Sequence, residues 1–119
     1  MTKFKVVLIA NNEAKREKGL MFTKPLHSDE VAYFTFTKPD CYGFWNKNVS
    51  YDLTLAFVDE NHKIIDFKDL KAEQEKTVYP DTQFVKYVIE ASKGAFDKYK
   101  IKIGDVVHHN DDELTIHSS

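Results

Sequence analysis

The stretch that decides the fold runs from Leu53 to Phe67 and reads LTLAFV, DENH, KIIDF. Its first six residues form an almost wholly apolar run of strand length, and its last five are again rich in β-forming residues. The four polar residues between them, 59–62, are typical of a turn. The pattern therefore predicts a β-hairpin made of strands 53–58 and 63–67.

Similar short runs on both sides of this hairpin predict further strands. Residues 31–36 alternate well enough for a strand, with odd-numbered side chains on one face and even-numbered side chains on the other. Lys38-Pro39-Asp40 is expected to break that strand. Residues 68–77 are polar without a clear period, and we expect a surface loop there. The other predicted strands are 3–10, 84–91, 106–108 and 114–116, and residues 44–49 are expected to be extended.

Two short helices are predicted between the strands. Asn11 or Asn12 can cap the first, because an amide oxygen accepts from a free backbone N–H at a helix start, and Gly19 suits the left-handed position after its end. Ser92 can cap a second helix that continues through Tyr99. We expect residues 1–119 to form one domain of mainly β structure. Its predicted architecture is a sandwich or jelly-roll-like barrel of about seven or eight short strands with two short helices, rather than a βαβ sheet.

The composition of the chain narrows its class. Hydrophobic residues make up 42% of the 119 residues, and nine Phe, six Tyr and one Trp supply large side chains for a core. The formal net charge is −2 with acids and bases mixed, so no basic patch for nucleic acid is expected. The single cysteine excludes an internal disulfide, and the first apolar run is too short to span a membrane. These features predict a soluble, cytoplasmic protein that binds neither nucleic acid nor membranes.

The segment GFWNKN, residues 43–48, holds the only tryptophan, Trp45, between aromatic and amide side chains. An aromatic face beside amide groups can form a small-ligand pocket, with Trp45 as an apolar wall and Asn46 and Asn48 as hydrogen-bonding partners. The same residues can also fill a core and stabilise a bend. The residues alone leave both interpretations open.

No complete catalytic or metal-binding motif accompanies this segment. Cys41 would need a base to act as a nucleophile, and the histidine nearest to it in the sequence is His27. His108 and His109 are adjacent on a predicted strand and therefore point to opposite faces, which disfavours a shared metal. A glycine-rich phosphate loop is absent as well. The sequence therefore predicts no cofactor, no metal and no catalytic residue.

Several fragments occur together in the order and spacing of one family. They are Glu13-x-x-Arg16-x-x-Gly19-Leu20-Met21-Phe22, Phe44-Trp45-x-Lys47-Asn48, Leu55-Ala56-Phe57-Val58-Asp59, Tyr79-Pro80, Lys86-Tyr87-Val88-Ile89-Glu90, Gly94 and Ile103-Gly104-Asp105. In these fragments the chain resembles the family called domain of unknown function 192, over nearly its whole length from Val6 to Val107. The resemblance implies a compact, mainly β fold of the jelly-roll-like kind, and it implies no established reaction.

The chain departs from the family pattern at three positions. Where relatives tend to carry Met, Pro and Asp, this sequence has Asn46, Asp52 and Thr54. A threonine cannot replace a carboxylate as a base or a metal ligand, so an activity that used that acid is not expected here.

The polar and aromatic members of the matching fragments are the predicted ligand-binding residues: Trp45, Asn48, Arg16 and Tyr79. Arg16 has an alternative partner in Glu13, three residues earlier on the same predicted helix. We expect a binding module for a small ligand or a protein, as a monomer or weak homodimer, rather than an enzyme. The alternatives are a hydrolase that uses a carboxylate or a metal in a shallow cleft, and an interaction protein without a pocket.

Overall fold

Seven strands form one sheet in the computed structural model, which describes residues 1–119, and their order is β4-β3-β5-β2-β1-β7-β6. The prediction of a mainly β fold with two short helices is confirmed. The strands are β1 (Thr2–Ala10), β2 (Glu30–Asp40), β3 (Leu53–Val58), β4 (Ile64–Leu70), β5 (Val85–Ser92), β6 (Val106–Asn110) and β7 (Glu113–His117). The helices are α1 (Glu13–Lys18) and α2 (Ala95–Lys98). Neither helix has the length and apolar character needed to cross a bilayer.

The strands β1 and β2 are parallel neighbours, and α1 lies on the connection between them. This connection is a βαβ unit, which the sequence did not lead us to expect. Parallel neighbours need a crossover that returns the chain to the same end of the sheet, and residues 11–29 provide it. All other neighbouring strands are antiparallel.

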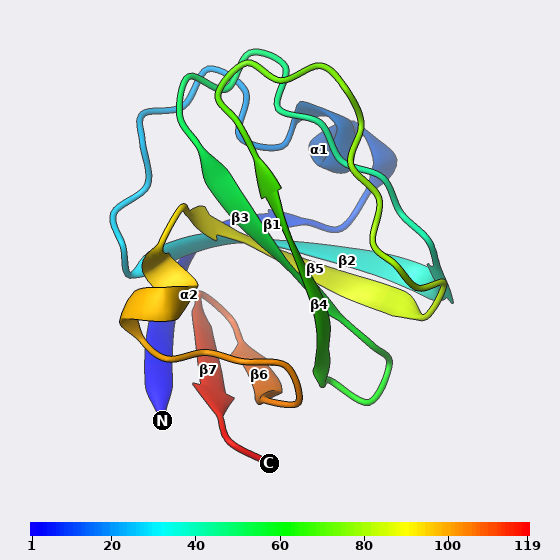
Figure 1. Ribbon diagram of the computed structural model, residues 1–119, viewed down its shortest axis with the longest axis vertical. Coiled ribbons are helices and arrows are strands. Elements are labelled where there is room, and N and C mark those ends of the chain that lie inside the picture. The colour runs from blue at the N-terminus through cyan, green and yellow to red at the C-terminus, as the bar shows by residue number, and fades with distance from the viewer.

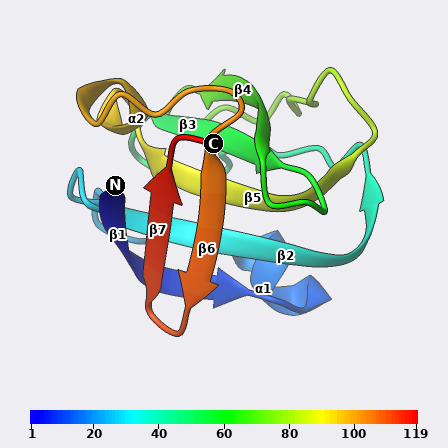
Figure 2. The same cartoon turned by 90° about the horizontal axis from the view of Figure 1, so that it is seen from below.

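The first strand belongs to two parts of the sheet. Residues 2–5 of β1 pair with β7, whereas residues 5–10 pair with β2, and the pairing register shifts between Val6 and Leu8. The hairpin of β6 and β7 consequently crosses steeply over β2, as Figure 2 shows. An isolated bridge between Lys63 and Val106 links the two ends of the sheet order. The sheet is therefore rolled toward a barrel rather than flat.

Each face of the rolled sheet carries its own hydrophobic core. On β2, Val31 and Tyr33 belong to one core and Ala32 and Phe34 to the other, which confirms the predicted alternation. The first core collects residues from all seven strands and from α2. The second lies on the opposite face and includes Leu20, which follows α1. Figure 1 shows α1 and the long loops at one end of the molecule, and α2, the β6–β7 hairpin and both termini toward the other.

Some predicted boundaries were wrong. Strand β2 continues to Asp40, past Pro39, because its pairing with β5 is interrupted between Thr35 and Asp40 and no ladder N–H is required from the proline. Strand β4 extends to Leu70, whose side chain is fully buried, so residues 68–70 are not loop. These extensions arise from tertiary pairing and burial, which local residue preference does not report.

The predicted start of α1 is confirmed, whereas the predicted start of α2 is wrong. The side chain of Asn12 accepts from the backbone N–H of Lys15 at 2.8 Å, and Gly19 follows the helix with φ 48°, as expected for α1. The predicted cap of α2 is wrong. Ser92 is the last residue of β5, and its hydroxyl donates to the carbonyl of Leu26 at 2.7 Å. Gly94, with φ 88°, precedes α2 instead.

Replacing Ile89 by alanine should destabilise the protein by about 2–5 kcal/mol, because Ile89 is fully buried on β5 and the truncation leaves a cavity. The matched control is Ile103→Ala. Ile103 is 60% exposed, and its loss should change the free energy of unfolding by less than about 0.5 kcal/mol. Urea denaturation of the two variants measures both values, and similar losses would contradict the assignment of the core.

Candidate ligand-binding cleft

A cleft of about 490 Å³ opens between α1 and the segment 42–49. The strands β2 and β5 contribute to its lining with Phe34, Phe36 and Glu90. Polar side chains from α1, residues 19–21 after it, Thr77, and the aromatic and polar side chains of the segment 42–49 complete it. The volume is in the range of small-molecule sites, and the mixture of aromatic walls with a few polar groups is typical of them.

Five aromatic side chains form the apolar wall of the cleft: Phe34, Phe36, Tyr42, Phe44 and Trp45. Phe44 meets Phe34 edge to face, with 5.2 Å between the ring centroids and 90° between the ring planes. Phe36 and Tyr42 stack with centroids 3.6 Å apart. Because four of these rings, those of Phe34, Phe36, Tyr42 and Phe44, pack against one another, this part of the wall is formed without a ligand.

The segment that carries Trp45 is fixed by a second loop. Phe44 and Val78 exchange two backbone hydrogen bonds of 2.9 and 2.8 Å, which pair residues 43–45 with residues 77–79. Gly43 has no room for a side chain, since a Cβ atom there would lie 2.6 Å from both Thr77 and the ring of Tyr79. The close approach of these two loops therefore requires a glycine at this position.

Arg16 joins α1 to β2 at the edge of the cleft. Its guanidinium donates to the carbonyl of Thr35 at 2.8 Å and lies 5.0 Å from the centroid of the Phe36 ring. No ion pair forms between Arg16 and Glu13, although both line the cleft. The pairing of Arg16 with Glu13 that the sequence allowed is therefore absent. Arg16 instead attaches the short helix to β2.

Asn46 lines the cleft from a buried position, with 1% of its surface exposed. Its side-chain NH₂ donates to the carbonyls of Tyr51 and Lys71 at 2.9 and 3.1 Å. Its side-chain oxygen is buried and has no hydrogen-bond donor. An unpaired buried acceptor costs about 1–3 kcal/mol, so this oxygen is a notable feature of the site.

Glu90 is the second buried polar group of the cleft, with 4% of its surface exposed. It lies on the interior strand β5 between Ala32 and Leu55, and it forms no ion pair. Burial raises the pKa of this carboxyl from 4.5 to about 8. The side chain is therefore a neutral carboxylic acid at neutral pH.

The structure brings two of the four predicted site residues into the cleft and leaves two outside its lining. Trp45 lines it with 40% of its surface exposed, and Arg16 lines it from α1. Asn48 lies at a bend with φ 62°, where its carbonyl accepts from the N–H of Phe22 at 2.9 Å. Tyr79 is exposed and packs its ring against Gly43. A role for any of these residues in binding remains a prediction.

Sequence reasoning missed Glu90 as a site residue, and it named Asn46 as a possible hydrogen-bonding partner in a pocket without including it among the four predicted site residues. A signal for Glu90 exists in the sequence. The run Val88-Ile89-Glu90-Ala91 is otherwise apolar, and an acid is rarely found in such a buried strand. For the burial of Asn46 no comparable signal exists. Its burial follows from contacts with Tyr51 and Lys71, and the second of these is 25 residues away in the sequence.

Thr54, the position where relatives tend to carry an acid, lies on the other side of the sheet. Its neighbour Leu55 belongs to the core on the cleft side, and successive side chains on a strand point to opposite faces. The hydroxyl of Thr54 donates to Asp69 across the β3–β4 pair at 2.8 Å. This residue is therefore separate from the cleft.

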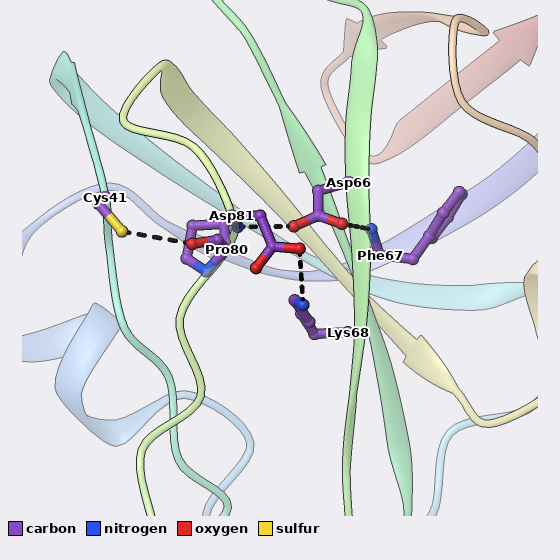
Figure 3. Close-up of polar contacts among 6 residues, drawn as sticks. All are labelled: Cys41, Asp66, Phe67, Lys68, Pro80 and Asp81. Atoms are coloured by element: carbon purple, nitrogen blue, oxygen red, sulfur yellow. Dashed lines mark hydrogen bonds and ion pairs between the residues drawn. The ribbon is translucent and has the colours of Figure 1, made fainter.

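Cys41 has no hydrogen bond to a base. Its thiol donates to the carbonyl of Pro80 at 3.5 Å, as Figure 3 shows. Asp81 follows Pro80 and forms an ion pair of 3.0 Å with Lys68, while its N–H donates to Asp66 at 2.9 Å. These contacts hold the loop near Pro80 against β4. Cys41 is thus a structural, half-buried thiol in this arrangement.

The adjacent histidines of β6 do lie on opposite faces. The ring of His108 stacks on that of His117, and their Nε2 atoms are 2.9 Å apart. The ring of His109 packs against Tyr33, with 5.0 Å between the ring centroids. No group of three or more His, Cys, Asp or Glu side chains converges on one point.

A larger concavity of about 710 Å³ lies beyond the end of α1. Leu20 and Met21 line both this hollow and the cleft. Its polar side chains, including Lys15, Lys24 and His27, are exposed to water rather than buried. Because it contains no buried polar group that needs a partner, it is the weaker candidate for a specific site.

Comparison with known proteins identifies relatives of the same fold. The model of the family DUF192, described as "Uncharacterized ACR", matches residues 2–109. A protein of unknown function from Novosphingobium aromaticivorans is 28% identical, with a TM-score of 0.81 over 89% of this chain and 75% of that one. A candidate transcription regulator from Sinorhizobium meliloti is 23% identical, with a TM-score of 0.81 over 95% of this chain and 81% of that one. The comparison with curated proteins gives no match.

Glu90 should make the stability of the protein fall as pH rises. Its carboxyl keeps its proton up to about pH 8 in the folded state and loses it near pH 4.5 when unfolded, so the unfolded state binds fewer protons in this interval. The free energy of unfolding should fall by up to about 1.4 kcal/mol per pH unit. The stabilisation is complete below pH 4.5 and is lost as pH rises through about 8.

Urea denaturation between pH 5 and pH 9 measures this dependence. Glu90→Gln should remove it and be more stable than the wild type above pH 8, because the amide cannot ionise. The matched control is Glu60→Gln at an exposed position, which should leave the slope in place. An equal slope in wild type and Glu90→Gln would show that Glu90 is not the group responsible.

Proposed function

The chain belongs to the DUF192 family, which is uncharacterised, and we propose a function for it from the cleft itself: the protein is a binding module that holds a small ligand between α1 and the Trp45 segment. The observation that carries the proposal is the pair of buried polar groups at the cleft. The side-chain oxygen of Asn46 is buried there without a hydrogen-bond partner, and the buried Glu90 side chain has no ion-pair partner.

Buried polar groups without partners weaken a fold. A protein can replace such a group by an apolar side chain of similar size with little loss of stability. In this protein they occur together at one concave surface with preformed aromatic walls. A ligand that hydrogen-bonds to both groups and covers the aromatic rings would recover this free energy on binding.

The proposal is for a small molecule rather than for nucleic acid. The Sinorhizobium meliloti neighbour is a candidate transcription regulator, but at 23% identity the likeness extends to the fold alone. A net charge of −2 supplies no general attraction for a polyanion. We further propose a cytoplasmic location and a monomer or weak homodimer, and the free thiol of Cys41 is compatible with a reducing compartment.

A hydrolase is the second candidate, and Glu90 is the observation that favours it. A carboxylic acid that stays protonated at neutral pH has the state required of a general acid. The other carboxylates that line the cleft, Glu13 and Glu17, lie exposed on α1, so a second acid held in a fixed position is missing. Turnover of simple ester or glycoside substrates that is lost in Glu90→Gln would favour this candidate over binding alone.

Binding of small fragments should be detectable by heteronuclear NMR, with the shifted backbone amides in residues 16–20 and 42–49 and around Phe34, Phe36 and Glu90. Trp45→Ala should weaken the bound fragments about tenfold, because the ring contributes contact area at the mouth of the cleft. The matched control is Phe84→Ala, which removes another exposed aromatic ring that lies outside the cleft. This variant should bind the same fragments with unchanged affinity.

Two results would count against the proposal. Fragments whose shifts cluster elsewhere, for example around Val7 and Phe22, would move the site to the larger concavity. If no fragment of a broad library shifts the amides around the cleft, the proposed small-ligand function is wrong. That result would favour an interaction protein without a pocket.

A further inference from the structure

The polar groups of the cleft point to the chemical class of its ligand. We propose that the cleft recognises a primary ammonium group, which donates to the side-chain oxygen of Asn46 and pairs with the carboxylate of Glu90 while aromatic rings surround the attached carbon chain. This inference rests on the proposed binding function and goes further by naming the group that is bound.

The orientation of the Asn46 amide determines what it can offer. Its NH₂ group donates to two backbone carbonyls, those of Tyr51 and Lys71. Turning the amide over would place its oxygen against both carbonyl oxygens, which is repulsive, so the assignment of nitrogen and oxygen is determined. The remaining polar atom is the unpaired oxygen. Asn46 can therefore present only an acceptor, and its missing partner is an N–H or O–H donor.

Glu90 lacks a cation as well. The protein has two ion pairs, Lys68 with Asp81 and Lys102 with Asp105, and neither involves Glu90. A buried carboxyl without a cation stays protonated, whereas an adjacent positive charge favours the carboxylate. An ammonium group provides that charge together with three N–H donors, and the carboxyl of Glu90 and the amide of Asn46 line the same cleft.

The walls of the cleft suit an organic cation. Two of the protein's own cations already lie over its aromatic rings: Arg16 is 5.0 Å from the centroid of Phe36, and the ammonium of Lys47 is 5.3 Å from that of Trp45. Aromatic faces attract cations through their quadrupole, and the attraction grows when water is excluded. The inner rings of Phe34 and Phe44 offer apolar contact to the carbon chain of an amine.

The proton balance of binding follows from this arrangement. Below about pH 8 Glu90 carries a proton in the free protein. When the ammonium enters, the O–H bond of the acid breaks, the proton passes to solvent, and the carboxylate that remains pairs with the ammonium. Affinity should then rise about tenfold per pH unit below the pKa of Glu90 and level off above it.

Other charged and titratable groups surround the cleft and must be separated from Glu90. Those that line it are Glu13, Arg16, Glu17, Lys18, Tyr42 and Lys47. Tyr51 is also close to Glu90. Burial raises the pKa of Tyr51, its hydrogen bond with Thr23 opposes this, and the negative charges of Glu90 and Glu30 raise it further. A substitution of Glu90 alone assigns the pH dependence to one group among these.

The experiment compares three probes of similar size by isothermal titration calorimetry and NMR: phenethylammonium, phenethyl alcohol and phenylacetamide. Phenethylammonium should bind at least tenfold more tightly than phenethyl alcohol at pH 8, and its affinity should rise with pH from 6 to 8. Titrations in two buffers of different ionisation enthalpy should show release of about one proton per ammonium bound at pH 6.5. This measurement needs no variant.

Two variants complete the test. Glu90→Gln should reduce phenethylammonium affinity at least tenfold and abolish the proton release, while the affinity for phenethyl alcohol stays within about twofold. Glu17→Gln, the matched control, removes a carboxylate at the same cleft from α1 and should change ammonium affinity by less than about threefold.

The outcomes separate this inference from the proposed function. If phenethyl alcohol or phenylacetamide binds in the cleft as tightly as the ammonium, or if no proton is released, the cleft binds ligands but the ammonium assignment is wrong. Tighter binding of phenylacetamide as pH falls would instead assign the site to a neutral amide that pairs with protonated Glu90. If none of the three probes binds in the cleft, both the proposed function and this inference are wrong.

Discussion

The pairing of β5 with both β2 and β3 is the constraint on which the rest of the structure depends. Because β5 is hydrogen-bonded on both edges, its register is determined twice, and successive side chains must point to opposite faces of the sheet. Ile89 therefore enters the core shared by all seven strands, and Glu90 faces the second core beside the cleft. A shift of one residue would exchange the two. The position of the buried acid is thus a property of the sheet, not of a flexible loop.

Around this acid the cleft is assembled from parts that are distant in the sequence. Helix α1 is only six residues long and depends on Arg16 and Leu20 for its attachment to the sheet. The Trp45 segment depends on its bridge to Val78 and on the close approach at Gly43. The aromatic rings and the orientation of the Asn46 amide are held before any ligand arrives. Such preorganisation lowers the entropy cost of binding, at the expense of two polar groups that remain unpaired in the free protein.

Some elements of this fold have local causes and others have non-local causes. The strand 53–58, the turn after it and the cap of α1, predicted at Asn11 or Asn12, are determined by residues within a few positions of one another, and all three were predicted. Pro39 inside β2 and Ser92 as the end of β5 were not, because each depends on a partner strand or on a loop more than 40 residues away. The Trp45 segment was selected for its composition, and the structure places Trp45 at the cleft while Asn48 serves a bend.

The sequence by itself determined the mainly β class, most of the strands and helices, and the family, because alternation, caps and ordered fragments are local or collinear signals. Only the tertiary structure decided which residues meet. It rolled the sheet through the divided pairing of β1, it connected β1 and β2 in parallel, and it buried Glu90 and Asn46 at one cleft. The physical reason is that burial and unpaired hydrogen-bonding groups depend on what the rest of the chain places beside a residue, and no local pattern contains that information.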